Sequence, residues 1–289
     1  MYKTAIISDE ASQDLRRAAS LAREFGLDAL EIRSVGEKNP FQMTPADFRE
    51  IRRIADDFGL RICAVASPLF KSPLGDAAET KRQTEALRRV AEGAHMLGTG
   101  LIRSFTFWRE PHRDLRRVAD AYETVLPLVE REELVLAVES EPSVNTANIA
   151  ELCDFLRTLN HPRVGALYDP GNEICWPSAP APYPEGYEQL EKWIRHIHVK
   201  DIHWAGDHYE PACLGEGDVD FPGLFARLRR DGYGGYLSVE THWRMRGTLD
   251  SALMRTPQGS GFSDGGMEAT RRYLEILRER GILRGGGAQ

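Results

Sequence analysis

Short apolar runs alternate with longer amphipathic segments along the whole chain. The runs rich in β-branched and other apolar residues predict strands at 4–8, 28–33, 61–67, 101–107, 134–140, 163–169, 194–201 and 235–241. Segments with helical periodicity follow at about 11–25, 44–59, 77–97, 112–131, 145–159, 221–232 and 264–280. Thr44 is the expected N-cap of its helix, with Pro45 at the first helical position. Strands that alternate with helices in this way predict a parallel sheet.

Eight such units predict a closed (β/α)8 TIM barrel of the α/β class rather than an open, doubly wound sheet. No linker or break in composition interrupts them, so we expect a single barrel domain over residues 1–284 and a flexible tail over 285–289. No GxGxxG motif follows the first strand, which argues against dinucleotide binding.

Composition narrows the classes of function. The 289 residues are 42% hydrophobic and 28% charged, which is ordinary for a globular protein, and the net charge is −7. That charge argues against a nucleic-acid partner bound by a broadly basic face, although it is compatible with a local cationic pocket. The chain shows no leader-like start, no long apolar run and no CxxC pair among its four cysteines, so we expect no membrane partner, no disulfides and a cytoplasmic location.

Three connections are longer than the rest, and all follow the carboxyl ends of predicted strands. They cover residues 170–186, 202–220 and 241–263. Long loops in compact domains commonly form lids, binding segments or subunit contacts. Their concentration on one face of the barrel predicts a substrate pocket there.

Four candidate metal ligands end the last four predicted strands. Glu139, Asp169, His198 and Glu240 are separated by 30, 29 and 42 residues, which suits consecutive β/α units. At the mouth of a barrel the four side chains would converge. Three carboxylates and one imidazole suit Mn²⁺ best, and Mg²⁺, Co²⁺ or Zn²⁺ also fit.

Each candidate has an ordinary structural alternative. A single glutamate at a strand end, such as Glu139, is more often a solvated or arginine-paired carboxylate than a ligand, and Asp169 is also compatible with a turn residue before Pro-Gly. His198 competes with His196, which lies on the same side of a strand of period two. Glu240 is also a possible partner for an arginine of the following loop.

The motifs ALEIR, VLAVESEP, ALYDPGN, HIHVKD, LGEGDVDF and GYLSVE, in this order, resemble the xylose-isomerase-like barrel family of sugar and sugar-phosphate isomerases and epimerases. The resemblance covers nearly the whole chain. It implies that Glu139, Asp169, His198 and Glu240 are the metal ligands, which selects His198 over His196. It also implies that Glu139 and Glu240 form the catalytic acid–base pair.

These residues predict proton transfer on a small-molecule keto-sugar. A divalent metal would stabilise a cis-enediolate while one glutamate removes a proton and the other returns one, giving an epimer or an aldose. The candidates for substrate binding are Asn172, Lys200, His242, Arg33, Arg103, Glu216 and Trp108. For Glu216 a structural turn is the first interpretation, and for Lys200 a structural ion pair is an equal alternative.

The chain departs from the best-known ketose 3-epimerases of this group in one respect. The segment after the seventh strand lacks their substrate-holding arginine, whereas the loop after the eighth strand holds Arg244, Arg246 and Arg255. This shift is compatible with a phosphorylated or carboxylated substrate, or with contacts to a partner subunit. The resemblance also implies a homodimer or homotetramer.

Three alternative functions stay open. A lyase or dehydratase of the same superfamily, of the 3-dehydroshikimate or inosose type, would use the same site residues. A non-catalytic sugar-binding barrel would have no need of both Glu139 and Glu240. The acidic charge and the few histidines of the site argue against the endonuclease branch.

Overall fold

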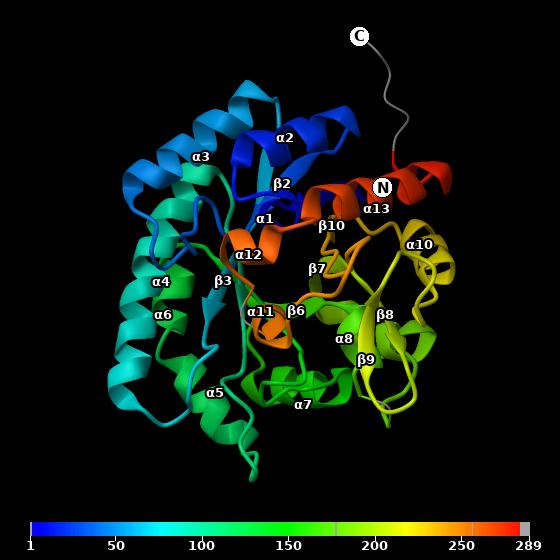
Figure 1. Ribbon diagram of the computed structural model, residues 1–289. Helices are drawn as coiled ribbons and strands as arrows, with labels where there is room; N and C mark the ends of the chain where they lie inside the picture. Colours follow the sequence, from blue (N-terminus) through cyan, green and yellow to red (C-terminus); the bar gives the residue numbers. More distant parts are fainter. Residues whose placement is uncertain (1, 177, 256, 284–289) are drawn as a thin grey trace.

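The apolar runs form eight parallel strands that close into a barrel in the computed structural model, which describes residues 2–283 apart from 177 and 256 (Figure 1). Going round the barrel, neighbouring strands follow the order of the chain, and the first strand pairs with the last. The predicted TIM barrel is therefore confirmed, while the predicted tail lies outside the described residues. The strands are β1 (Lys3–Ile7), β2 (Ala29–Ile32), β3 (Arg61–Leu69), β4 (Leu101–Ser104), β5 (Val135–Glu139), β6 (Val164–Tyr168), β7 (Ile194–Val199) and β10 (Tyr236–Val239).

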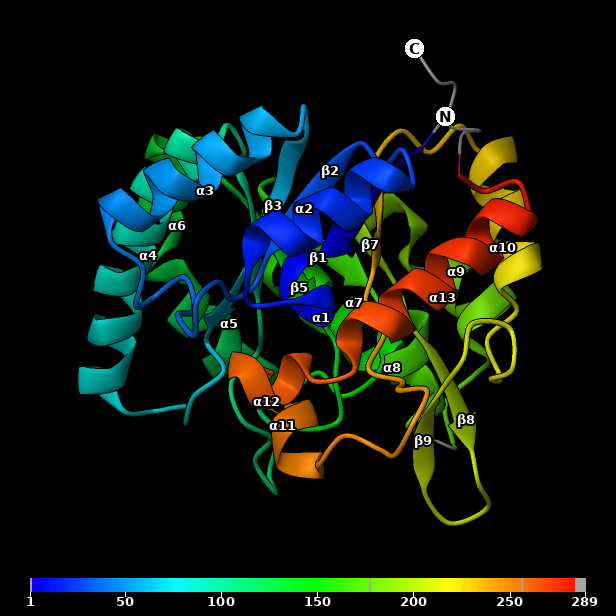
Figure 2. The ribbon, with the colours of Figure 1, turned by 45° about the horizontal axis from the view of Figure 1, so that its top comes forward.

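Helices surround the strands, as Figure 2 shows. The main ones are α2 (Leu15–Glu24), α3 (Pro45–Asp57), α4 (Ala77–Leu97), α5 (Leu115–Glu123), α6 (Leu126–Arg131), α7 (Ile149–Leu159), α10 (Phe221–Arg230) and α13 (Gly266–Glu279). The predicted cap of α3 is present: the hydroxyl of Thr44 accepts from the backbone N–H of Asp47, whose side chain accepts from that of Thr44.

Two predicted helices are each divided in two. The segment predicted at 11–25 forms α1 (Ser8–Ala11) and α2, because Ser12 is extended and Asp14 caps a new helix start. The segment predicted at 112–131 forms α5 and α6, because Pro127 lacks an N–H group to continue the first helix and instead opens the second.

Six of the eight predicted strands are shorter than expected, and at two of them the chain takes a different structure. The strand predicted at 101–107 ends at Ser104, and the chain then turns through Phe107, whose φ is 62°. The run predicted at 194–201 ends as β7 at Val199, and Asp201 begins a hairpin that the sequence did not reveal. Its antiparallel strands are β8 (Asp201–Trp204) and β9 (Tyr209–Ala212).

Short elements lie on the connections that follow β6 and β10. Between β6 and β7 they are α8 (Pro170–Ile174), the π-helix η1 (Pro182–Gly186), α9 (Tyr187–Leu190) and the 3-10 helix η2 (Glu191–Trp193), which ends directly before β7; after β10 they are α11 (Ser251–Arg255) and α12 (Gly259–Ser263). In both ribbon views α11, α12 and the hairpin β8–β9 lie at the same end of the barrel (Figures 1 and 2). Among the described residues, no helix is long and apolar enough to cross a membrane.

Candidate metal centre and active site

The four side chains proposed as metal ligands meet at the carboxyl ends of four neighbouring strands. Glu139 ends β5, Asp169 follows β6, His198 lies on β7 and Glu240 follows β10. Each can offer one ligand atom such that all four atoms lie within 4.8 Å of one another, and each residue is at most 3% exposed. The spacing argument therefore placed them together correctly.

Asp169 is oriented by the short helix that it begins. Its Oδ1 atom accepts from the backbone N–H of Gly171 at 2.9 Å, as an N-cap of α8. A Cβ atom at Gly171 would lie only 2.5 Å from the carbonyl oxygen of Lys200, so glycine permits this close approach. The sequence DPGN thus leaves Oδ2 of Asp169 as the oxygen available to the centre.

His198 is oriented from behind by Glu31, a buried residue of β2. Its Nε2 atom lies 3.2 Å from both carboxylate oxygens of Glu31, and His196 shares the same carboxylate at 2.8 Å. A donated Nε2–H leaves Nδ1 as the metal-facing atom. That atom lies 3.4 Å from Oε2 of Glu240 and has no hydrogen-bond partner.

Three buried cationic side chains compensate the carboxylates. Arg33 donates to Oε1 of Glu240 at 2.7 Å, and Arg103 donates to Oε2 of Glu139 at 3.2 Å. The Nζ atom of Lys200 lies 2.6 Å from Oδ2 of Asp169 and 2.9 Å from Oε2 of Glu240.

Both arginines therefore contact carboxylates of the candidate metal centre.

The protonation behaviour of the centre follows from burial and these charges. Burial, with the nearby Glu240 and Glu139, raises the pKa of Asp169 to about 6 against the opposing effect of Lys200. Burial works against a charged His198, but Glu31 and Glu240 raise its pKa to about 10. Burial also opposes ionisation of Glu240, yet Lys200, His242 and His198 hold its pKa well below the usual range.

The donor set fits a divalent cation. Oδ2 of Asp169 and Nδ1 of His198 are both buried without a hydrogen bond, and the contact of Oδ2 with Lys200 is an ion pair of poor hydrogen-bond geometry. Mostly hard oxygen donors with one imidazole are typical of Mn²⁺ and Mg²⁺ sites. We take these four residues as the candidate metal centre.

Two further groups of buried side chains contain residue types that could bind a metal ion. Glu10, Glu240 and His242 form one, but Arg33 already donates to Glu10 and to Glu240, both at 2.7 Å. Glu31, Cys63 and His196 form the other, where the Glu31 carboxylate bonds both histidines of β7. In the first group Arg33 already supplies the positive charge. In the second group the Glu31 carboxylate orients His198.

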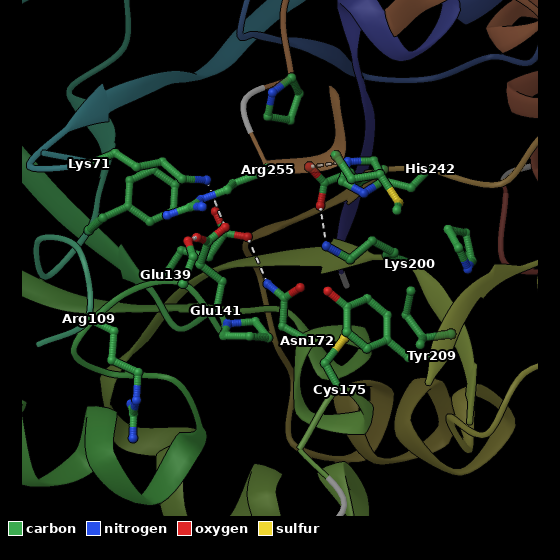
Figure 3. Close-up of a pocket in the computed structure, with 18 of the residues that line it drawn as sticks. Lys71, Arg109, Glu139, Glu141, Asn172, Cys175, Lys200, Tyr209, His242 and Arg255 are labelled. Atoms are coloured by element: carbon green, nitrogen blue, oxygen red, sulfur yellow. Dashed lines mark hydrogen bonds and ion pairs between the residues drawn. The ribbon is translucent and has the colours of Figure 1, made fainter. Parts of the chain in front are cut away.

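A cavity of about 670 Å³ opens above the metal centre. Figure 3 shows Glu139, Lys200 and His242 around it, with Asn172 donating to Oε1 of Glu139 at 3.1 Å. Of the residues predicted to bind substrate, Asn172, Lys200, His242, Arg103 and Trp108 line this cavity.

Arg33 and Glu216 do not line the cavity. Arg33 is 2% exposed and lies behind Glu240. Glu216 is exposed on a turn after β9, whose neighbouring glycine N–H groups donate to Asp201 at 2.7 and 3.2 Å. The motif LGEGDVDF therefore forms a structural turn here, in keeping with the first interpretation given for Glu216.

Several lining residues were not identified as site residues from the sequence. They are Lys71, Phe105, Arg109, Glu141, Cys175, Tyr209 and Met254. Arg255, considered above in connection with a phosphorylated or carboxylated substrate, also lines the cavity. Lys71 and Arg109 come from loops after β3 and β4, and Tyr209 comes from the unforeseen hairpin. No local sequence pattern distinguished them, because only the closed barrel brings these loops to one cavity.

The closed barrel of eight parallel strands indicates the class of protein. The sequence model of the xylose isomerase-like TIM barrel family matches residues 19–263, so the chain belongs to this family. L-ribulose-5-phosphate 3-epimerase UlaE of Salmonella paratyphi C (strain RKS4594) is 26% identical over 257 residues, covering 83% of this chain and 85% of that protein.

Solved structures share the fold at lower identity. The probable 3-DHS dehydratase AsbF from Bacillus anthracis superposes with a TM-score of 0.74 at 17% identity, covering 96% of this chain and 99% of that one. D-allulose 3-epimerase from Methylomonas sp. gives a TM-score of 0.72 at 15% identity, covering 96% and 98%. The named relatives thus include sugar epimerases and a dehydratase.

Proposed function

We propose that the protein is a divalent-metal-dependent isomerase or epimerase of a keto-sugar, in which Glu139 and Glu240 move the proton. The observation that carries this proposal is the convergence of two buried glutamates with Asp169 and His198 at the floor of one cavity. The epimerases among the relatives support the same reaction class.

Glu139, Asp169, His198 and Glu240 would hold the cation, and Mn²⁺ suits their donors best. A divalent ion there would supply Lewis acidity toward the carbonyl oxygen of the sugar and so favour loss of the neighbouring proton. The buried environment strengthens such electrostatic effects, because little water competes.

In this proposal the two glutamates act on different sides of the substrate. Glu139 ends β5 and Glu240 follows β10, with β6 and β7 between these strands. One carboxylate removes the proton beside the carbonyl to give an enediolate of the sugar, and the other returns a proton. Return to the opposite face of the same carbon gives an epimer, and return to the neighbouring carbon gives an aldose.

The surrounding side chains keep each glutamate in a fixed orientation. Arg103 and Asn172 donate to the two oxygens of Glu139 at 3.2 and 3.1 Å. Arg33 and Lys200 donate to those of Glu240 at 2.7 and 2.9 Å. Fixed carboxylates are what positioned acid–base catalysis requires.

The direct test is product analysis. A panel of ketoses and ketose phosphates is incubated with Mn²⁺-loaded protein and with chelator-treated protein, and products are identified by NMR after the metal is removed. A new epimer or aldose that forms only with metal supports the proposal. An unsaturated product would establish the dehydratase alternative, and no conversion by protein shown to hold metal would contradict both.

A further inference from the structure

Arg255 differs from every other cation of the cavity wall. The lining includes five cationic side chains: Lys71, Arg103, Arg109, Lys200 and Arg255. The first four each pair with a carboxylate, at 2.8 Å for Lys71 with Glu141 and 2.9 Å for Arg109 with Glu151. Within the described part of the chain, no carboxylate forms an ion pair with Arg255, whose guanidinium lies 4.8 Å from the ring centroid of Trp108.

A second cation lies beside the same ring. The Nζ atom of Lys71 is 5.8 Å from the Trp108 centroid and 4.6 Å from that of Phe105. Lys71 and Arg255 therefore both place a positive charge beside one indole, and Glu141 pairs with Lys71 (Figure 3). An anionic ligand at this ring would supply the carboxylate-like partner that Arg255 lacks among the described residues.

The overall charge of the cavity points the same way. The five lining cations face five carboxylates: Glu139, Glu141 and Glu240 of the lining, Asp169 beside Lys200, and Glu151 beside Arg109. A bound divalent ion would add positive charge to this balance, although the net charge of the whole chain is −7. A concave site of one sign concentrates ligands of the opposite sign.

We infer that the substrate carries an oxyanionic group, a phosphate or a carboxylate, away from its reacting carbonyl, and that Arg255 and Lys71 receive this group beside Trp108. The inference rests on the proposed function and names the substrate class of the same site. Arg255 lies on α11, in the long connection after β10. The segment that would recognise the anionic group is therefore separate from the strand ends that carry the candidate metal ligands. The planar guanidinium suits bidentate contact with such an anion.

The test compares kcat/KM for a neutral ketose, its terminal phosphate ester and the matching ketose with a terminal carboxylate. R255Q should lower the value for the preferred anionic substrate about 10–100-fold, the loss of a hydrogen bond to a charged group, and leave the neutral ketose within about 2-fold. R255K should recover part of the loss. R246Q is the matched control, because Arg246 is exposed on the same loop and does not line the cavity.

The three substrates distinguish a phosphate from a carboxylate. Equal losses for neutral and anionic substrates in R255Q, or no loss at all, would overturn the inference.

A binding measurement separates this inference from the proposed function. Inorganic phosphate is titrated calorimetrically into Mn²⁺-loaded wild-type protein, R255Q and R246Q. If R255Q alone binds phosphate about 10-fold or more weakly than wild type, the result supports the anion site even if no ketose is converted. Equal binding by all three proteins overturns the anion site, whatever the outcome of the product analysis.

Discussion

The Nε2 atom of His198 lies 3.2 Å from both carboxylate oxygens of Glu31, a residue 167 positions away in the chain. Both side chains are fully buried, and the contact directs the other ring nitrogen of His198 toward Glu139 and Glu240. A carboxylate behind a metal-binding histidine fixes both its tautomer and the orientation of its ring.

The first prediction concerns this contact. E31Q should weaken Mn²⁺ binding about 10–100-fold, because the amide no longer supplies the negative charge that orients His198 and favours its Nε2–H. Titration of metal into the apoprotein measures the affinity, and circular dichroism checks the fold. E216Q, at an exposed turn, should bind metal like the wild type; equal affinity of E31Q and wild type would contradict the role of Glu31.

Metal binding should release protons. With a pKa of about 10, His198 carries a proton on the metal-free protein at neutral pH, and a cation must displace the one that blocks its ligand nitrogen. Affinity for Mn²⁺ should therefore rise with pH by up to about tenfold per unit between pH 7 and 9. It should fall further as Asp169 is protonated below its pKa of about 6.

Calorimetric titration in two buffers of different ionisation enthalpy counts the protons released. Release of about one proton at pH 7.5 is expected. A pH-independent affinity with no proton release would show that His198 is already neutral.

Lys200 should matter most to the metal-free protein. Its ammonium group contacts Asp169 and Glu240, so K200M leaves buried carboxylates with less compensation. Removal of one partner from a buried pair typically costs about 3–5 kcal/mol. We expect a lower Tm for metal-free K200M that saturating Mn²⁺ largely restores. The same loss of Tm with and without metal would contradict a compensating role.

Glu173 should make stability depend on pH. Burial raises its pKa from 4.5 to about 7, while its carboxylate accepts from the backbone N–H of Ile149. Because the folded protein holds this proton more tightly than the unfolded chain, this group's contribution to stability is lost as pH rises from about 4.5 to 7.

Relative to wild type, the free energy of unfolding of E173Q should therefore increase by about 2–3 kcal/mol when the pH is raised from 4.5 to 8. Urea unfolding at both pH values measures the difference, with E92Q at an exposed position of α4 as the control. Parallel pH profiles for wild type and E173Q would refute the buried, proton-binding state of Glu173.

The strands and the convergence of the four candidate ligands could be predicted because their signals are local. Buried parallel strands are nearly continuous apolar runs, so a polar residue at the end of each run, such as Glu139 or Glu240, stands out. The register of a closed barrel then brings these ends together without further information.

The rest of the site depends on contacts that no local pattern encodes. Arg33 donates to Glu240, which is 207 positions away in the chain, and Arg255 lies over the ring of Trp108 although the two residues belong to different connections. The hairpin β8–β9 that carries Tyr209 has a polar, irregular sequence, so periodicity did not separate its strands from a loop.

Solvent-proton exchange tests the central claim most directly. The experiment uses Mn²⁺-loaded wild-type protein, E139Q, E240Q and E216Q, each shown to hold the metal. Each protein is incubated in D₂O with a ketose that the wild type converts, and the products are examined by NMR. The account predicts deuterium at a carbon beside the carbonyl with wild type and E216Q, and rates about 10²–10⁴-fold lower with E139Q and E240Q. Undiminished exchange in either glutamate variant, or a product formed with no deuterium incorporated, would contradict proton transfer by Glu139 and Glu240.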